Sequence, residues 1–289
     1  MKVNKKIRRL KGVSKMIENN NVYDYDGINL MEALLEERGN ECVDMIICDL
    51  PYTYKGKARV TANKWDTPID TERFFELASY LLSEKGVLCL TATQPFTSHL
   101  ISTLERMSTD DRYRNVDLVN YKYEWIWEKD NGSNFVHVKH QPFRVHESVL
   151  VFGKSPTTYN KKGEYMCYNP QFVKGEPYKV KRKGRMTSNL ATSVGYELTD
   201  GEYDDKRYPR SVQKFNLEKG LHPTQKPVSL FSYLIRTHSN EGDLVLDVCC
   251  GSGTTAIACI ETNRNYIVND LSFDYYNVTT NRIEEYKRI

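Results

Sequence analysis

The sequence lacks long hydrophobic runs, paired cysteines and any excess of glycine or proline. No apolar stretch approaches the roughly 18 residues that a membrane helix requires, and the basic residues 1–6 are not followed by the apolar segment of a signal peptide. Only 16 Gly and 10 Pro occur among 289 residues, which excludes collagen-like and low-complexity chains. The seven cysteines are odd in number and contain no Cys-x-x-Cys pair, so they indicate neither a disulfide framework nor a zinc site. We expect a soluble cytoplasmic protein with no metal ion and no membrane partner.

The charge that is present is unevenly distributed, although the net charge is only +3. Residues 1–20 carry seven Lys or Arg and one Glu, and residues 154–220 carry 14 Lys or Arg and eight Asp or Glu. Each segment is therefore +6, which leaves −9 for the rest of the chain. Two basic segments on an acidic body favour contact with a polyanion such as nucleic acid. Solvated surface loops are the alternative interpretation of the same pattern.

Apolar runs alternate with segments of helical periodicity, which is typical of an open parallel α/β sheet. Strands are predicted at 43–49, 87–90, 121–127, 148–152, 244–248 and 266–268, and helices at 71–83, 95–107, after Pro227, from Thr254 and from Asp274. Residues 154–220 lose this periodicity, which indicates an inserted module or a loop-rich surface. Because such sheets bind ligands at the carboxyl ends of their strands, the residues that follow the strands are the candidate site.

A glycine-rich turn, Gly251-Ser252-Gly253, lies between a predicted strand and a predicted helix. Glycine lets a ligand approach the backbone closely, but Ala256 replaces the third glycine of the dinucleotide fingerprint and no Gly-Lys-Ser/Thr follows. Asp270 ends the next strand, 19 residues after Gly251, where a carboxylate can accept hydrogen bonds from ribose hydroxyls. These residues suit a nucleoside without an essential pyrophosphate, such as S-adenosylmethionine (SAM), although an ordinary tight turn would also explain the glycines.

A second strand end carries Asp49-Leu50-Pro51-Tyr52. An exocyclic amino group on a nucleic-acid base is a poor nucleophile because its lone pair is delocalised into the ring. A carboxylate and a backbone carbonyl that accept its two hydrogens would localise that lone pair, and Tyr52 could stack on the ring. Methylation at carbon 5 of cytosine instead needs an attacking thiolate, commonly in Pro-Cys, and no proline here precedes a cysteine. Taken alone, these four residues could also be a simple turn.

The combination of motifs is more specific. The segment His-Pro-Thr-Gln-Lys-Pro at 222–227 precedes Asp247 and Gly251-Ser252-Gly253-Thr254-Thr255 by about 20 residues, and it resembles the β-class DNA amino-methyltransferases. Residues 207–212 are similar to the family's lead-in to this block. In that class the catalytic motif precedes the cofactor motif with the target-recognition region between them, and here Asp49 precedes Gly251 by 202 residues. The resemblance covers nearly the whole chain from about Val22.

The resemblance implies a Rossmann-like α/β fold: a seven-stranded SAM-dependent methyltransferase sheet, circularly permuted, with an inserted irregular target-recognition region. It also implies that the strand before Asp49 and the strand before Asp247 are neighbours in the sheet. The predicted organisation is a basic arm at 1–21, a catalytic half at 22–153, the target-recognition region at 154–220 and a cofactor-binding half at 221–289.

The family's site residues carry over by position. The catalytic residues implied at the target base are Asp49, Pro51 and Tyr52. The implied SAM-binding residues are Asp26 near the adenine, Thr224 and Lys226 near the methionine carboxylate, Asp270 at the ribose, and Asp247, Gly251, Ser252, Gly253 and Thr254. Three positions depart from the family pattern, with Leu50 for the first proline, Cys249 for an aromatic residue and Asp270 for the more usual glutamate.

The implied function is site-specific methyl transfer from SAM to the exocyclic amino group of a flipped base in double-stranded DNA. An Asp-first motif favours N6 of adenine over N4 of cytosine. An RNA or protein-glutamine methyltransferase and a catalytically silent DNA-binding protein are the alternatives, and a homodimer or a cognate restriction endonuclease stays open as a partner. The strongest basic run is expected to contact DNA phosphates through Lys174, Lys179, Lys181, Arg182, Lys183 and Arg185, with a solvated loop as the alternative.

Overall fold

The computed structural model describes residues 16–53, 68–132, 134–158, 163–181, 185–186, 196–197, 200–218, 220 and 224–288. Two compact units divide the chain. The first comprises Met1–Asn169 and Ser211–Ile289, and the second is Pro170–Arg210.

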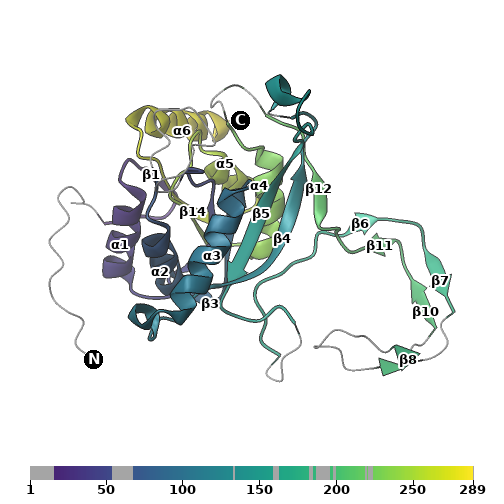
Figure 1. The fold of residues 1–289 in the computed structure, drawn as a ribbon. Coiled ribbons are helices and arrows are strands. Elements are labelled where there is room, and N and C mark those ends of the chain that lie inside the picture. Colours follow the sequence, from purple (N-terminus) through teal and green to yellow (C-terminus); the bar gives the residue numbers. More distant parts are fainter. Residues whose placement is uncertain are drawn as a thin grey trace. The chain divides into compact units, whose positions relative to one another are not determined.

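An eight-stranded sheet forms the centre of the first unit, in the order β1-β14-β13-β2-β3-β5-β4-β12 (Figure 1). Its strands are β1 (Asn21–Tyr23), β2 (Val43–Cys48), β3 (Leu82–Ala92), β4 (Asn120–Glu128), β5 (His146–Gly153), β12 (Val212–Lys214), β13 (Leu244–Asp247) and β14 (Asn265–Asn269). This confirms the α/β class, while the count of seven strands was one too low. The three-residue strand β12 has no apolar run to mark it in the sequence and is defined by its pairing with β4.

One strand runs against the others, which corrects the expectation of a parallel sheet. β5 pairs antiparallel with both β3 and β4. The sequence explains this, because the segment between the strands predicted at 121–127 and 148–152 has no run of helical periodicity long enough for a crossover α-helix, so the chain turns back. As a result the first residues of β5 lie at the carboxyl ends of β3 and β4, with Ser148 opposite Ala92 and Glu147 opposite Trp127.

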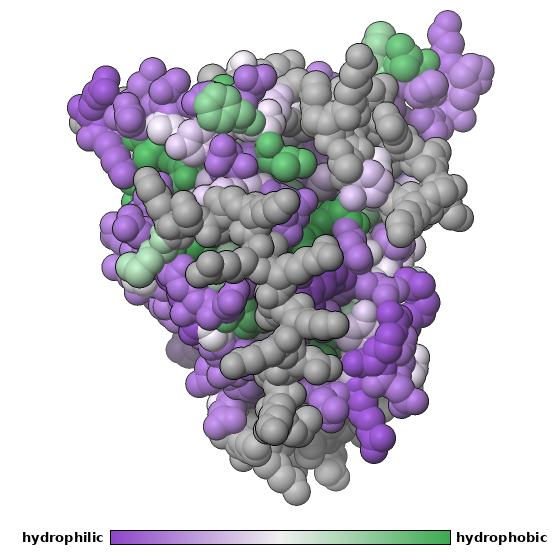
Figure 2. Space-filling model, turned by 90° about the vertical axis from the view of Figure 1, so that its left-hand side faces the viewer, coloured by the Kyte–Doolittle hydropathy of each residue, from purple (hydrophilic) through white to green (hydrophobic). Residues whose placement is uncertain are grey.

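Helices cover both faces of the sheet (Figure 1). One apolar layer packs α1 (Gly27–Arg38), α2 (Thr71–Leu81) and α3 (Phe96–Thr109) against side chains such as Ile46 and Leu88, and the other packs α4 (Val228–His238), α5 (Thr254–Glu261) and α6 (Phe273–Tyr286) against side chains such as Met45 and Val87. Among the coloured residues on the face shown in Figure 2, apolar side chains form small patches between hydrophilic ones. None of the helices in these described segments is long and apolar enough to span a membrane.

The predicted adjacency of the two motif-bearing strands is confirmed. β13 pairs in parallel with β2, with Val245 opposite Met45 and Leu246 opposite Ile46. The segments that follow both strands therefore meet at one edge of the sheet. β3 begins at Leu82, directly after α2, so the predicted strand at 87–90 is longer and Gly86 lies within it. A Cβ at Gly86 would lie 2.9 Å from the Ser83 carbonyl oxygen of the same strand and 3.1 Å from the Asp44 carbonyl oxygen of β2, so backbone crowding from both strands explains the glycine.

The second unit consists of short antiparallel pairs. β6 (Val173–Lys174) pairs with β11 (Lys206–Arg207), β7 (Tyr178–Val180) with β10 (Gly201–Tyr203), and β8 (Arg185–Met186) with β9 (Tyr196–Glu197). The pairs are nested in sequence, so the chain runs out along one side and returns along the other. Tyr178 and Tyr203 stack with their ring centroids 4.7 Å apart, and the Arg207 guanidinium lies over the Tyr178 ring. The unit lies within the predicted recognition region at 154–220.

Candidate active site

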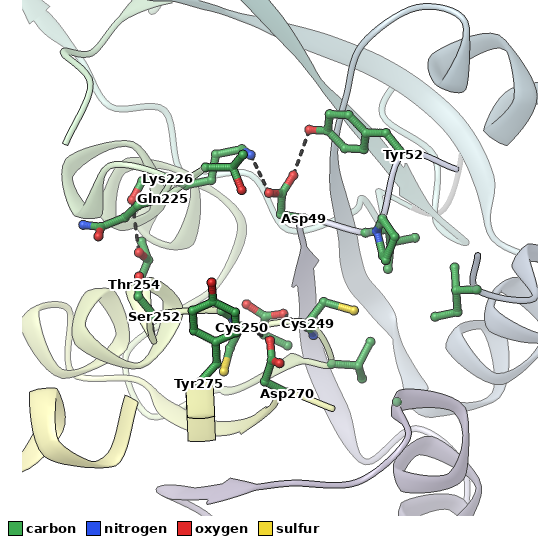
Figure 3. A pocket seen from close by; sticks show the side chains of 18 of the residues that line it. Asp49, Tyr52, Gln225, Lys226, Cys249, Cys250, Ser252, Thr254, Asp270 and Tyr275 are labelled. Atoms are coloured by element: carbon green, nitrogen blue, oxygen red, sulfur yellow. Dashed lines mark hydrogen bonds and ion pairs between the residues drawn. The ribbon is translucent and has the colours of Figure 1, made fainter. Parts of the chain in front are cut away.

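A cavity of about 660 Å³ lies at the sheet edge where β2, β13 and β14 end. It brings together most of the residues that the sequence singled out: Asp26, Asp49, Pro51, Tyr52, Thr224, Lys226, Asp247, Gly251, Ser252, Thr254 and Asp270. Figure 3 shows the Asp49 carboxylate with Tyr52 and Lys226 on one side, and the turn that contains Ser252, together with Asp270, on the other. The motifs on the two strand ends therefore face one space.

The glycine-rich turn owes its shape to its two glycines. Gly251 has φ +54° and Gly253 has φ +80°, in the left-handed region that L side chains rarely adopt. A Cβ at Gly253 would lie 2.7 Å from the Thr279 Cγ2 atom, and the Thr279 hydroxyl donates to the Gly251 carbonyl at 2.8 Å. Gly253 is absent from the residues that line the cavity. Its contribution in this structure is to let the turn pack on α6.

Asp247 supports the turn from beneath. Its side chain is buried, with Oδ1 accepting from the Cys249 N–H at 2.9 Å and Oδ2 accepting from the Thr255 hydroxyl. Burial raises the pKa of this carboxyl to about 7. Both oxygens are thus engaged, one by the turn and the other by the first turn of α5, which is a structural function that the motif alone did not reveal.

Two further carboxylates border the cavity. Asp270 Oδ2 accepts from the Gly251 N–H and Oδ1 from the Ser272 N–H, each at 2.9 Å, and burial raises the pKa of the Asp270 carboxyl. These bonds join the end of β14 to the glycine-rich turn. Asp26 caps α1, with Oδ1 accepting from the Ile28 and Asn29 N–H groups, and its side chain is exposed at the cavity.

Asp49 is held by three donors. Its Oδ1 accepts from the Tyr52 hydroxyl at 2.8 Å and from the Thr91 hydroxyl of β3, and its Oδ2 forms an ion pair with the Lys226 ammonium at 2.5 Å. Tyr52 stacks on Phe96 with ring centroids 5.5 Å apart. Burial, together with the charges of Asp49 and Glu147, raises the pKa of Tyr52 well above its ordinary value, so the phenol is neutral and donates.

Lys226 was expected near the methionine carboxylate of SAM, and in this structure it lies beside Asp49. Its ammonium binds Asp49 and lies over the Tyr52 ring, 5.7 Å from the centroid. Burial alone would lower the pKa of Lys226, but the carboxylates of Asp49 and Glu147 raise it. The Lys226 carbonyl accepts from the Thr254 hydroxyl at 3.0 Å, which ties this segment to the start of α5. The role expected for Lys226 at a methionine carboxylate stays a prediction.

Glu147 is the residue that sequence reasoning missed. It is the second residue of β5, and its Oε2 lies 3.6 Å from the Lys226 Nζ and 3.3 Å from the Tyr52 hydroxyl. Its Oε1 pairs with the buried Lys129 ammonium, which lies over the Trp127 ring. Burial would raise the pKa of Glu147, but Lys226 and Lys129 lower it. In the sequence, Glu147 is marked only as an acid at the start of an apolar strand. It follows Asp49 by 98 residues, so no local pattern indicates that the two carboxylates share a site.

Comparison with known proteins identifies the family. The family model described as DNA methylase, for N6 and N4 methylation, matches residues 43–281, which is most of the chain. The chain belongs to the DNA methylase family. Type II methyltransferase M.HpaI of Haemophilus parainfluenzae is 27% identical over 258 residues, covering 89% of this chain and 72% of that protein. DNA adenine methyltransferase YhdJ of Escherichia coli K12 is 23% identical over 262 residues, covering 87% and 80%. The crystal structure of the M1.HpyAVI–SAM complex shares the fold, with a TM-score of 0.56, 19% identity, and coverage of 91% of this chain and 98% of that chain.

The basic residues expected to contact DNA lie in the second unit of this methylase. Lys174, Lys179 and Lys181 are exposed, and Lys179 pairs with the exposed Glu202. Arg185 is part of β8, whereas Arg182 and Lys183 lie outside the described residues. Exposed aromatic side chains accompany the lysines, among them Phe172, Tyr178, Tyr203 and Tyr208.

Proposed function

We propose that this methylase transfers a methyl group from SAM to the N6 amino group of adenine in double-stranded DNA, at a specific sequence. The observation that carries the proposal is the single cavity shared by the Asp49 carboxylate and the glycine-rich turn (Figure 3). A base that enters this cavity must leave the helical stack, as in other enzymes that modify bases. The Asp49 acceptor and the turn then bring target and cofactor into one cavity.

The composition and size of the cavity fit SAM. A volume of about 660 Å³ is in the range of small-molecule sites. Five carboxyl side chains line it (Asp26, Asp49, Glu147, Asp247 and Asp270), against two cationic ones (Arg144 and Lys226). An excess of acceptors suits a ligand with a sulfonium, an ammonium and ribose hydroxyls. When bound, SAM supplies an electrophilic methyl group.

Individual residues divide the work of holding that ligand. Asp270 already accepts two backbone hydrogen bonds and is held rigidly, so its remaining lone pairs can accept from the ribose hydroxyls. Asp26 offers its exposed carboxylate from the start of α1. The positive φ angles of Gly251 and Gly253 bend the turn so that Ser252 and the backbone border the cavity.

On the target side, Asp49 accepts the amino hydrogens and so localises the nitrogen lone pair. Three donors already occupy the carboxylate, and the Lys226 ammonium also covers part of the Tyr52 ring. The target amino group therefore competes with Lys226 for Asp49. Glu147, 3.6 Å from the Lys226 Nζ, is the anion that receives Lys226 when the base enters. Glu147 acts as a positioning residue, and Lys129 balances its charge.

Two considerations favour adenine. In the β-class DNA amino-methyltransferases, which this chain resembles, motifs that begin with Asp go mostly with adenine. Among the relatives, YhdJ is named as a DNA adenine methyltransferase. Cytosine N4 is the alternative within the same family. Sequencing that reports modified bases in a host expressing this chain, with Asp49→Ala as the control, tests the assignment. N6-methyladenine at one motif supports the proposal, and N4-methylcytosine would overturn the choice of base. No modification in the host that expresses the wild-type chain, with no label transferred from SAM to duplex DNA in vitro, would overturn the activity.

We also propose that residues 154–220 recognise the target and that the run from Lys174 to Arg185 contacts phosphates. Each phosphate neutralised contributes about −0.9 to the slope of log K against log salt. Replacing Lys181, Arg182 and Lys183 with Ala should flatten that slope by up to about 2–3 units. Binding should weaken for all sequences alike, because phosphate contacts position a protein without reading bases. A wild-type slope in the triple variant would assign this run to a solvated loop.

A further inference from the structure

The loop between β4 and β5 carries the most exposed pair of neighbouring apolar side chains in the described part of the chain. Phe135 and Val136 are 76% and 81% exposed, and Val138 and Phe143 are also exposed. The first two belong to a short 3-10 helix, η2 (Phe135–His137). Figure 1 shows this loop projecting beyond the ends of β4 and β5. Exposing large apolar groups to water is unfavourable, so a cluster of them marks a surface for contact.

Polar interactions hold this loop in shape. The Asn134 side chain is buried, its Nδ2 donating to the Pro142 carbonyl at 2.9 Å and its Oδ1 accepting from the Arg144 N–H at 2.8 Å. One side chain thus joins both arms of the loop. Gly132 lies against Phe143, whose ring would be 2.5 Å from a Cβ at that position. These contacts hold the two arms of the loop together, and the apolar tip extends from them.

The loop also borders the active-site cavity. Arg144 and His146, on its returning arm, line the cavity, and the Arg144 guanidinium donates to the Thr93 hydroxyl at 3.0 Å. Glu147 follows directly. The exposed part of the loop also carries Lys139, His137 and His140. The one acidic residue of the loop, Asp130, accepts a hydrogen bond from the Leu217 N–H. Apolar groups accompanied by the cationic side chains of Lys139 and Arg144, at the edge of the cavity proposed to bind a base, match a DNA duplex, with its stacked bases between rows of phosphates.

We propose that Phe135 and Val136 form a wedge that enters the DNA stack beside the flipped base; this inference rests on the proposed function. Moving a base out of a duplex breaks its pairing and stacking and leaves a gap. Apolar side chains inserted at a base step fill such a gap and are a known means of opening duplex DNA. Lys139 then faces the phosphate backbone. The wedge lowers the cost of flipping and takes no part in methyl transfer.

The test compares the double variant Phe135→Ser/Val136→Ser with wild type and with Met16→Ser, a control that removes an exposed apolar side chain elsewhere. The probe is a duplex with the motif found by methylation sequencing and 2-aminopurine at the target base, read by fluorescence. Turnover is measured on two further duplexes that keep the normal target base, one fully paired and one with an abasic site opposite that base, which lowers the cost of flipping. SAM affinity of the free protein is measured by calorimetry.

We expect the double variant to show at least a tenfold lower kcat/KM on the paired duplex and a reduced fluorescence increase. Activity should return to within about threefold of wild type on the abasic duplex, with unchanged SAM affinity, because the wedge acts on flipping. Equal losses on both duplexes, or wild-type behaviour on both, would overturn the wedge; the second result would assign the apolar tip to a protein partner. If wild type itself methylates neither duplex, the proposed function fails instead.

Discussion

Replacing Glu147 with Gln removes one negative charge from the active site while changing its shape very little. The amide oxygen can still accept from the Tyr52 hydroxyl, which lies 3.3 Å from Oε2 in the wild type. The four buried or partly buried charges, Asp49, Glu147, Lys129 and Lys226, balance in the wild type and leave one excess positive charge in the variant. Lys226 then has Asp49 as its remaining carboxylate partner in this cluster.

The size of the effect follows from the distances. At an effective dielectric constant of 20, two unit charges about 4 Å apart interact by about 4 kcal/mol, and the Lys226 Nζ lies 3.6 Å from Glu147. Desolvation and relaxation offset part of this, and Lys226 keeps its contact with Asp49. We expect roughly 1.4–2.8 kcal/mol to appear as weaker access of the target amino group to Asp49. That corresponds to a 10- to 100-fold lower kcat/KM for DNA.

Steady-state methylation of a duplex that carries the motif found by methylation sequencing measures this effect. Glu128→Gln is the matched control, since Glu128 is exposed on β4 next to the site strand. Glu147→Asp keeps the charge and should retain more activity than Glu147→Gln, and SAM affinity should stay within about twofold of wild type in both. Thermal unfolding identifies any variant that fails to fold. A folded Glu147→Gln protein with wild-type kcat/KM, or with activity equal to that of Glu147→Asp, would refute the proposed exchange of Lys226.

Three further outcomes are expected. Asp270→Ala should weaken SAM binding by about 1–3 kcal/mol, as for hydrogen bonds to a charged acceptor. The control Asp274→Ala, at an exposed residue, should leave SAM binding unchanged. If calorimetry gives the two variants equal affinities for SAM, Asp270 is not part of the site. Gly253→Ala should cost more stability than Gly39→Ala, because both glycines have φ near +80° but only Gly253 has a neighbour within 4 Å; equal losses in urea titrations would mean that strain alone matters. Burial lowers the pKa of His238 to about 4. As the pH falls, the unfolded chain therefore binds a proton at this residue before the folded protein does. The free energy of unfolding should fall by about 3 kcal/mol between about pH 6.5 and pH 4. His238→Gln should remove that dependence, and an unchanged profile would locate it elsewhere.

The sequence by itself determined the strands and the chemistry at their ends. An apolar run followed by Asp49, and another followed by Asp247 and a glycine-rich turn, are local patterns, because a buried strand and a tight turn each depend on a few consecutive residues. The resemblance to the β-class enzymes added that these two strands are neighbours, and the register of β2 with β13 confirms it. The weakly marked strands β1 and β12 carry no such pattern and emerged only through pairing with β14 and β4.

Only the tertiary structure decided which charges meet around Asp49. Glu147 joins the site because β5 runs antiparallel to β3 and β4, which puts the first residues of this strand at the edge where the parallel strands end. A parallel strand would have brought its last residues there instead. Lys226 lies 177 residues beyond Asp49 in sequence yet binds it directly. Interactions between charges depend on distance through space and on exclusion of water, and both are set by how the strands and helices pack.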